Sequence, residues 1–435
     1  MRSQHGSLLA LAFTLIAASQ MPAQSFTCGT ATAHASALTS STLAMDKATG
    51  WDLNSVPTIA GGVCSSSKPF YLSIPLAEGN YRVTAVLGGA QASVVTVRSE
   101  ARRLMVEKLS VAANASVTRS FDVNVRIADF VKPDGTAGRV KLKQREIGNV
   151  DWDNKLTLEF NGTNPSLRSL SIEPLTGAKA EPTLYMAGDS TMTDQDTEPW
   201  ASWGQMLPRF FLPGIAISNH AESGESSGSF LGEQRFAKII SMIKPGDFFI
   251  VQFAHNDQKV KDFLPRYSVI MTQFVTEVRA KGATPIIVTS MNRDSFDESG
   301  HIKDTFAGYI QAAQEVAKNT NTTLIDLNAM SKTMFEAMGP KQTDHAFMHF
   351  AANTFPGQTT AINDNTHFNN YGAYELARCV VQAIRDQKLP LAKYLDPTVA
   401  DFNPAKPDAF EKFSLPFTPI QKVEDTTKIP QADLK

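Results

Sequence analysis

The sequence has no excess of charge of either sign. Its 435 residues include 41 Lys and Arg against 43 Asp and Glu, a formal net charge of −2, and it contains no Lys/Arg-rich block. Nucleic-acid tracks and membrane-surface patches both need concentrated positive charge, so we expect neither kind of partner. The hydrophobic share of 42% indicates a globular protein with a sizeable core, and the length indicates two domains.

Long apolar runs are also scarce. The run from Leu8 to Ala18 is too short to span a bilayer core of about 30 Å, and no later run is long enough. Arg2 precedes this run and the small residues of Ala23-Gln24-Ser25 follow it, which is typical of a signal peptide cleaved near Ser25. We therefore expect residues 1–25 to be removed and the protein to be secreted or periplasmic.

Cysteine is rare, and three cysteines leave one thiol unpaired in an oxidising compartment. Cys28 and Cys64 lie in the same N-terminal region and are candidates for a disulfide, a question that the sequence leaves open. Cys379 recurs with apolar residues at helical spacing and is interpreted as a core residue and not as a nucleophile. Its neighbours in that stripe are Leu376, Val380, Ala383 and Ile384.

Residues 26–177 are predicted to form an all-β sandwich. Short β-branched runs alternate there with turn residues, and no helical periodicity interrupts them. The expected strands are Tyr71 to Ile74, Asn80 to Leu87, Ala92 to Val97, Val117 to Val125, Lys155 to Phe160 and Leu167 to Ile172.

Residues 178–390 change to a rhythm in which strands alternate with helices. Five such units imply a parallel sheet with helices on both faces and ligands at the carboxyl ends of the strands. The expected strands are Thr183 to Ala187, Ile215 to Asn219, Phe248 to Phe253, Pro285 to Ser290 and Thr323 to Leu327, with helices at Gln234 to Ile243, Tyr267 to Lys281 and Phe306 to Lys318. The Pro-rich, charged tail, 391–435, is expected to wrap the surface or to be partly disordered.

Two short motifs contain the residue types that form the active site of a serine esterase. Ser190 follows the first strand of the α/β region in Gly188-Asp189-Ser190-Thr191, where Gly188 permits a sharp exit and Asp189 can bond nearby N–H groups. Asp364 and His367 are three residues apart, so on a helical or turn-like segment the carboxylate can take the imidazole Nδ1 proton. The other nitrogen, Nε2, then faces Ser190 as a base.

Two further strand ends offer hydrogen-bond donors. Gly224 follows the second strand in a small, polar stretch where the main chain can approach a substrate oxygen. Asn256 follows the third strand, and its amide can reach an oxyanion. Each feature alone is as consistent with an ordinary loop, so the inference depends on the four occurring together and in order.

That order, serine, glycine, asparagine and histidine, resembles the SGNH or GDS-type hydrolases over residues 183 to 385. The surroundings are similar to rhamnogalacturonan acetylesterases, through Gly188-Asp189-Ser190-Thr191, Trp203-Gly204, Asn219 with Ala221 and Gly224, His255-Asn256-Asp257 and Asp364 to Asn369 with Tyr371-Gly372-Ala373. The resemblance implies a flavodoxin-like three-layer domain and a catalytic triad of Ser190, His367 and Asp364. It also implies oxyanion donors at Ser190, Gly224 and Asn256, no cofactor, and an accessory N-terminal sandwich that binds carbohydrate or packs on the esterase domain.

Three features compete with or depart from this interpretation. Gly224-Glu225-Ser226-Ser227-Gly228 matches the G-x-S-x-G elbow of α/β-hydrolases, which makes Ser226 a rival nucleophile, although no His-Gly-Gly motif accompanies it. His345 and His349 have the spacing of zinc ligands on a helix but lack the accompanying glutamate, so no metal site is expected. Ala254 stands where the family usually has glycine, and its methyl group is expected to narrow the acyl pocket or shift the strand end.

The sequence therefore predicts a secreted esterase that removes acetyl groups from acetylated pectin, with rhamnogalacturonan as the expected substrate. The partner is then an acetylated polysaccharide or oligosaccharide. Two alternatives remain open. One is a GDS-type lipase or thioesterase with an apolar acyl pocket, and the other is a non-catalytic carbohydrate-binding protein.

Overall fold

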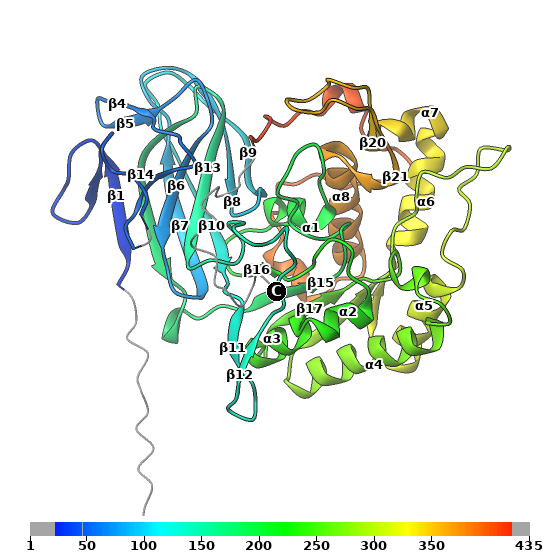
Figure 1. Ribbon diagram of the computed structural model, residues 1–435. Helices are drawn as coiled ribbons and strands as arrows, with labels where there is room; N and C mark the ends of the chain where they lie inside the picture. Colours follow the sequence, from blue (N-terminus) through cyan, green and yellow to red (C-terminus); the bar gives the residue numbers. More distant parts are fainter. Residues whose placement is uncertain (1–21, 46, 420–435) are drawn as a thin grey trace, which may run out of the picture.

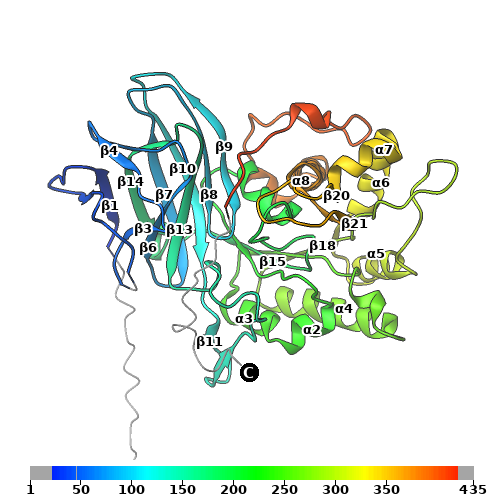
Figure 2. The same ribbon diagram turned by 45° about the horizontal axis from the view of Figure 1, so that its top comes forward.

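The computed structural model describes residues 22–45 and 47–419. Residues 1–21 of the expected signal peptide lie outside the described residues, whereas Gln24 and Ser25 form part of the first strand, β1 (Gln24–Cys28). The chain folds into an N-terminal β region and a C-terminal α/β region that lie side by side in both views (Figures 1 and 2). No helix in the described ranges has the length and apolar content needed to cross a membrane.

The N-terminal region consists of two largely antiparallel sheets that share one apolar core. The first has the order β10-β7-β14-β1-β2, with β5 pairing β14 and β4, and the second has the order β3-β6-β13-β8-β9. Alternate residues point inward, so Val83 and Ala85 of one sheet meet Leu156 and Leu158 of the other in a fully buried cluster. The bounds are β2 (Ser36–Leu38), β3 (Gly50–Asp52), β4 (Thr58–Ala60), β5 (Val63–Ser65), β6 (Phe70–Pro75), β7 (Gly79–Leu87), β8 (Ser93–Ser99), β9 (Arg103–Val111), β10 (Val117–Val125), β13 (Lys155–Thr163) and β14 (Ser166–Pro174).

The six strands expected in this region are all present. Strand β10 has the expected bounds. Strands β6, β7, β13 and β14 exceed the expected lengths by one to three residues, and β8 begins one residue later and ends two residues later than expected. Strand β9 was not predicted, because its charged residues obscure the alternation, and Lys108 adopts a left-handed φ of 38° beside a register shift. A small hairpin, β11 (Asp129–Val131) with β12 (Ala137–Arg139), extends toward the α/β region (Figure 1).

The C-terminal region is built on a five-stranded parallel sheet of order β16-β15-β17-β18-β19. Its strands are β15 (Thr183–Ala187), β16 (Ala216–Asn219), β17 (Phe248–Val251), β18 (Thr284–Val288) and β19 (Thr323–Ile325). The chain leaves β15, the second strand in this order, toward β16 on one side and returns to β17 on the other, so the loops that follow these three strands meet at one edge.

Side chains on the two faces of this sheet enter two separate cores. Leu184, Met186 and Ile250 pack against α1 (Trp203–Met206), α6 (Leu327–Met338) and α8 (Asn370–Asp386). Tyr185, Ala187 and Val251 pack against α2 (Ser227–Gly232), α3 (Arg235–Met242), α4 (Leu264–Ala280) and α5 (Tyr309–Asn319). Figure 2 shows these two helical layers above and below the sheet, and the predicted α/β character is confirmed.

Most expected elements of the α/β region lie where the sequence placed them. Strand β15 has the expected bounds, and the ends of the other strands and of α3, α4 and α5 differ by one to three residues. Helix α8 contains the apolar stripe around Cys379 that the sequence showed at helical spacing. The elements that were not predicted include α1, α2, α6, α7 (Pro340–Thr343) and a hairpin of β20 (Phe347–Phe350) with β21 (Ile362–Phe368).

The C-terminal tail returns to the N-terminal region and wraps the surface, one of the two expected outcomes. Pro416 O accepts a hydrogen bond from Arg98 Nη2 at 2.8 Å, and Phe417 O accepts one from Asn161 Nδ2 at 2.8 Å. Thr418 Oγ1 donates to the buried Glu159 at 3.1 Å. The tail up to residue 419 thereby ties the two regions together, and the rest of the predicted 391–435 segment lies outside the described residues.

Two of the three cysteines form a disulfide and the third is a free, buried thiol. Cys28 and Cys64 form a disulfide, which settles the open question of their pairing. Cys379 is free, fully buried in α8, and burial raises the pKa of its thiol, so it behaves as a core residue.

We predict that Gly372→Ala destabilises the protein while Gly232→Ala does not. A Cβ at Gly372 would lie 2.1 Å from Ala346 O, so helix α8 would have to move away from the segment before β20. Overpacking of this kind costs about 1–3 kcal/mol. The helical Gly232 has no atom within 4 Å of such a Cβ. Chemical denaturation of both variants checks the difference, and equal stabilities would contradict this packing.

Candidate active site

Ser190 lies just beyond the carboxyl end of strand β15. The chain leaves β15 through Gly188, where a Cβ would lie 2.8 Å from Met192 Sδ and 3.0 Å from Gln252 O, so only glycine fits there without displacing its neighbours. The carboxylate of Asp189 accepts from Thr191 N at 2.9 Å and from Thr191 Oγ1 at 2.8 Å, which confirms its predicted role in the turn. This turn presents the Ser190 hydroxyl at the rim of the sheet.

A continuous chain of hydrogen bonds joins Ser190, His367 and Asp364. Ser190 Oγ lies 2.8 Å from His367 Nε2, and His367 Nδ1 lies 2.7 Å from Asp364 Oδ2. Each ring nitrogen thus contacts the partner that the sequence assigned to it. In the tautomer with the proton on Nδ1, the carboxylate accepts that proton and Nε2 is free to accept the proton of Ser190.

The backbone that carries Asp364 and His367 forms the turn-like alternative of the expected segment, at an irregularity in a strand. Both residues lie in strand β21, where regular pleating would point residues three apart to opposite faces. The pairing with β20 jumps from Asp364 opposite Met348 to Phe368 opposite Phe347, so the intervening residues bulge out of the ladder. Asp364 Oδ1 accepts from the N–H groups of Thr366 at 2.8 Å and His367 at 3.1 Å, and this turn brings the imidazole over the carboxylate.

The same contacts set the electrostatics of Asp364. Partial burial on its own raises the pKa of this carboxyl, but the hydrogen bond and charge of His367 and the two N–H groups outweigh burial and lower the pKa below its usual range. Asp364 is therefore ionised at neutral pH, which is the form that holds and stabilises a protonated imidazole.

A network of amide hydrogen bonds, which no sequence motif predicted, supports the Ser190 turn. Trp203 Nε1 donates to Gln252 Oε1 at 2.9 Å, and Gln252 Nε2 donates to Thr191 Oγ1 at 2.8 Å. Gln195 Nε2 donates to Ser190 O at 2.8 Å. Both glutamines lie outside the motifs that led to the site, and only the contacts in three dimensions reveal their function. Their side chains fix the main chain on both sides of the candidate nucleophile.

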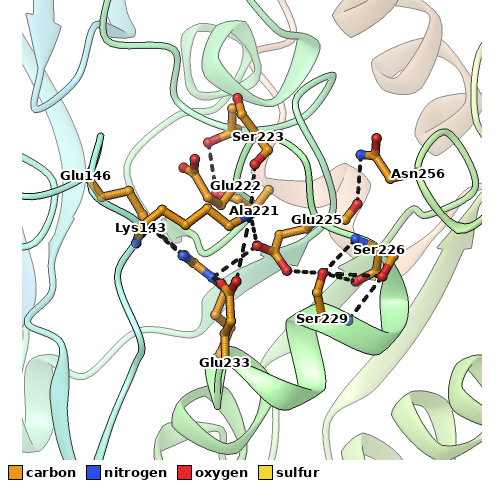
Figure 3. Close-up of polar contacts among 12 residues, drawn as sticks. Lys143, Glu146, Ala221, Glu222, Ser223, Glu225, Ser226, Ser229, Glu233 and Asn256 are labelled. Carbon is orange, nitrogen blue, oxygen red and sulfur yellow. Dashed lines mark hydrogen bonds and ion pairs between the residues drawn. The ribbon is translucent and has the colours of Figure 1, made fainter. Parts of the chain in front are cut away.

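The two expected donor residues lie in neighbouring loops. Gly224 is exposed and has a φ of +77°, a conformation that favours glycine. Asn256 Nδ2 donates to Glu225 O at 2.9 Å, as the dashed line in Figure 3 marks, and Asn256 Oδ1 accepts from Lys259 Nζ at 2.8 Å. Among the hydrogen bonds of the described residues, none engages the main-chain N–H of Ser190 or of Gly224. Asn256 is thus fastened to the loop that contains Gly224.

Ser226 does not compete with Ser190 for this position. It is the N-cap of helix α2, where its hydroxyl accepts from Ser229 N at 3.1 Å and the Ser229 hydroxyl accepts from Ser226 N at 2.9 Å. No described histidine hydrogen-bonds to Ser226. The G-x-S-x-G match is therefore a capping box and not a nucleophile elbow.

His345 and His349 do not share a site. The His345 ring stacks on Phe410 at a centroid distance of 4.7 Å. His349 Nε2 lies 3.2 Å from Asp294 Oδ2, and Asp344 lies beside them, so that one ligand atom from each of these three residues falls within 4.8 Å of the others. The carboxyl of Asp294, partly buried and close to Asp344, has a pKa raised to about 6. Of the groups described, this cluster is the one whose composition suits a metal ion.

A small cavity opens beside the imidazole. Its volume is about 210 Å³, and its lining is mainly polar. The lining residues are Gln195, Asp196, Thr197, Trp200, Ser223 and His367. Ala254 is absent from this set and is fully buried in the core beneath the sheet, so its methyl group does not narrow this cavity.

Two arginines of the N-terminal region support one wall of the cavity. Arg102 Nη1 donates to Gln195 O at 3.1 Å and to Trp200 O at 2.8 Å, and Arg102 Nη2 pairs with Glu198 at 2.9 Å. Arg103 Nε pairs with the buried Asp194 at 3.0 Å. Both arginines are almost fully buried, and no sequence motif identified them. The N-terminal region thus packs on the α/β region directly behind the site.

The site as a whole suits acyl transfer. A hydroxyl, an imidazole and a carboxylate form one hydrogen-bonded series, and an exposed glycine N–H and an amide lie in the adjoining loops. The series can move one proton away from Ser190 and hold the resulting positive charge on His367.

Comparisons with known proteins show which family and which esterases the chain is similar to. Residues 186–374 match the GDSL-like Lipase/Acylhydrolase family, and this range contains every candidate residue from Ser190 to His367. The chain is similar to rhamnogalacturonan acetylesterase RhgT of Bacillus subtilis (strain 168), with 39% identity over 216 residues, 49% of this chain and 93% of that protein. It is also similar to the probable rhamnogalacturonan acetylesterase YesY of the same strain, with 32% identity over 217 residues, 48% of this chain and 95% of that protein.

The chain is also similar to solved structures. Protein YxiM from Bacillus subtilis is 23% identical and aligns with a TM-score of 0.46, covering 85% of this chain and 99% of its own. The acetylxylan esterase Axe2 from Geobacillus stearothermophilus aligns with 16% identity and a TM-score of 0.35, covering 47% of this chain and 94% of its own.

We predict that Asp364→Asn lowers kcat for a small activated ester by about 10,000-fold, the size of effect expected when the acid that orients a catalytic imidazole is lost. The amide cannot hold the Nδ1 proton as the ionised carboxylate does. Asp396→Asn is a matched control, because Asp396 also accepts from a main-chain N–H two residues on, that of Thr398 at 2.8 Å, but has no histidine. Steady-state kinetics checks both variants, and a kcat near that of wild type for Asp364→Asn would contradict the assigned geometry.

Proposed function

The chain belongs to the GDSL-like lipase/acylhydrolase family and is a serine hydrolase acting on carboxylic esters, and on this premise we propose that it removes acetyl groups from acetylated pectin, with rhamnogalacturonan as its substrate. The observation that carries the proposal is the unbroken hydrogen-bonded series of Ser190, His367 and Asp364. The names of the two relatives support the carbohydrate acetyl ester as the bond that is cleaved.

The dimensions of the cavity favour a small acyl group. About 210 Å³ lined by an amide, a carboxylate, hydroxyls and one indole accommodates an acetyl group and part of a sugar. A long alkyl chain would need an extended apolar channel, and this lining does not provide one. The lipase alternative is therefore the weaker proposal.

Ser190 is proposed as the nucleophile. As Oγ attacks the acetyl carbonyl carbon, His367 Nε2 takes the hydroxyl proton and Asp364 stabilises the imidazolium through Nδ1. The tetrahedral intermediate then collapses, the bond to the sugar oxygen breaks, and that oxygen leaves with the proton from His367. Water, deprotonated by the same imidazole, attacks the acetyl-enzyme and releases acetate and the free serine.

The negative oxygen of the intermediate requires donors that are already in place. The N–H groups of Ser190 and Gly224 and the amide of Asn256 are proposed to provide them. Each such donor contributes about 2.7–4 kcal/mol of transition-state stabilisation. Support comes from Asn256 and Gly224 being held in one unit through the hydrogen bond to Glu225 O.

Export from the cytoplasm is proposed on two grounds. The sequence of residues 1–25 has the pattern of a signal peptide, and the Cys28–Cys64 disulfide suits an oxidising compartment. A polymeric pectin substrate is met outside the cell, so secretion and substrate are consistent with each other.

We predict that Ser190→Ala abolishes acetate release from acetylated rhamnogalacturonan and that Ser226→Ala leaves most of it. Ser190 loses the attacking atom, whereas loss of the Ser226 cap costs about 1 kcal/mol of stability. Acetate measured from rhamnogalacturonan, acetylated xylan and a long-chain ester distinguishes the alternatives. Faster cleavage of the long-chain ester would favour the lipase, and no turnover of any ester by wild type would favour a non-catalytic binding protein.

A further inference from the structure

The loop that contains Gly224 is held from outside the α/β region. Residues Lys143 to Glu146 of the N-terminal region, here called the 143–146 segment, reach across to the turn of Glu222 to Glu225 (Figure 3). Lys143 Nζ donates to Ser223 O at 2.9 Å, and Arg145 Nη2 makes a second, shorter contact with the same oxygen. Two cations from one domain thus converge on a single carbonyl of the other.

That carbonyl belongs to the same peptide unit as the Gly224 N–H. A peptide unit is planar, and this one is trans, so its C=O and N–H point in opposite directions. Fixing Ser223 O on the two cations therefore fixes the direction of the Gly224 N–H on the other side. Ser223 also lines the cavity beside His367, which places this peptide at the site. Hydrogen bonds in series polarise one another, so cations on the carbonyl strengthen the N–H as a donor.

Ion pairs anchor the 143–146 segment on both sides of this peptide. Arg145 Nε pairs with Glu222 at 2.6 Å, on the N-terminal side of the Ser223–Gly224 peptide, and Lys143 Nζ pairs with the fully buried Glu225, on its C-terminal side. Glu146 pairs with the fully buried Arg235, whose Nη1 lies 3.0 Å from Glu146 Oε1. Removing one member of such a pair leaves the other charge uncompensated, so the arrangement is held as a unit.

The turn is fastened on its other flank by Asn256, through the hydrogen bond to Glu225 O at 2.9 Å. The Gly224 N–H thus lies between a carbonyl bound by the N-terminal region and a carbonyl bound by a proposed oxyanion donor. Without these contacts the peptide next to Gly224 could rotate, because glycine, which has no side chain, has the widest conformational range. The contacts on both flanks remove that freedom.

We propose that Lys143 and Arg145 are positioning residues for the oxyanion hole, so that the N-terminal region completes the active site. This inference rests on the proposed function, because it assumes that the Gly224 N–H receives the negative oxygen of the tetrahedral intermediate. It assigns the N-terminal region a role in the chemical step itself, distinct from binding of polysaccharide.

The test compares Arg145→Met, Lys143→Met and the double variant on 4-nitrophenyl acetate, in the full chain. This small ester cannot contact the N-terminal region as a polysaccharide does, so its kcat reports the chemical step. Loss of one oxyanion donor lowers kcat by about 100- to 1,000-fold, and this is the largest loss expected for the double variant. For Arg145→Met we expect kcat to fall roughly tenfold and KM to change little, because the donor is misplaced but still present. Arg145→Lys should recover part of the loss, because the ammonium keeps a cation near Ser223 O.

Controls separate positioning from folding. Titration of competent sites with an organophosphate places kcat on a per-site basis, and thermal unfolding reports stability. Arg139→Met is the matched control, because Arg139 lies in the same region and pairs with Asp129 at 2.6 Å on the β11–β12 hairpin. It should leave kcat unchanged.

The outcomes are distinct. If wild type shows Ser190-dependent turnover and the Arg145 and Lys143 variants keep the wild-type kcat per site, the positioning role is wrong and the proposed function stands. If these variants melt at a lower temperature but keep the wild-type kcat per site, the two cations stabilise the fold only, and the positioning role is again wrong. If wild type has no Ser190-dependent turnover of any acetyl ester, the proposed function fails and this inference fails with it.

Discussion

The hydrogen bond between Ser190 Oγ and His367 Nε2, 2.8 Å long, joins residues that are 177 positions apart in the sequence. Three features of the fold place its two ends. Strand β15 delivers Ser190 to the sheet edge, the irregular pairing of β20 with β21 turns His367 toward it, and Phe368 O accepts from Ala201 N at 2.8 Å beside both. A shift of about 1 Å in any of them would break this bond and with it the path of the proton.

The boundary between the two regions contains buried ion pairs. Arg102, Arg103 and Arg235 are almost fully buried, and each contacts a carboxylate across that boundary. Breaking a buried pair by removing one partner costs about 3–5 kcal/mol, whereas the intact pair contributes little to stability. These pairs therefore make the relative position of the regions specific. Since the same boundary supports the cavity wall and the Gly224 loop, that specificity extends to the site.

The sequence predicted the parts of this arrangement that are local. The short apolar run of Thr183 to Ala187, one of five strand candidates, and the three-residue spacing of Asp364 and His367 were enough to predict the sheet and the candidate triad, because these signals act within a few residues. Of the helical or turn-like backbone expected for Asp364, the turn is found, because its carboxylate bonds to nearby N–H groups at a break in a strand ladder. Gln252, Arg102 and Arg145 could not be predicted, because their function arises from contacts with segments far away in the sequence.

The central claim, that Ser190 is the nucleophile and His367 its base, is tested most directly by locating a covalent adduct. Wild-type protein treated with diethyl 4-nitrophenyl phosphate, digested and analysed by tandem mass spectrometry should carry the diethylphosphoryl group on Ser190 alone. The His367→Ala variant should label far more slowly, because no base removes the hydroxyl proton. A label on Ser226, or labelling of Ser190 at an undiminished rate without His367, would contradict the account.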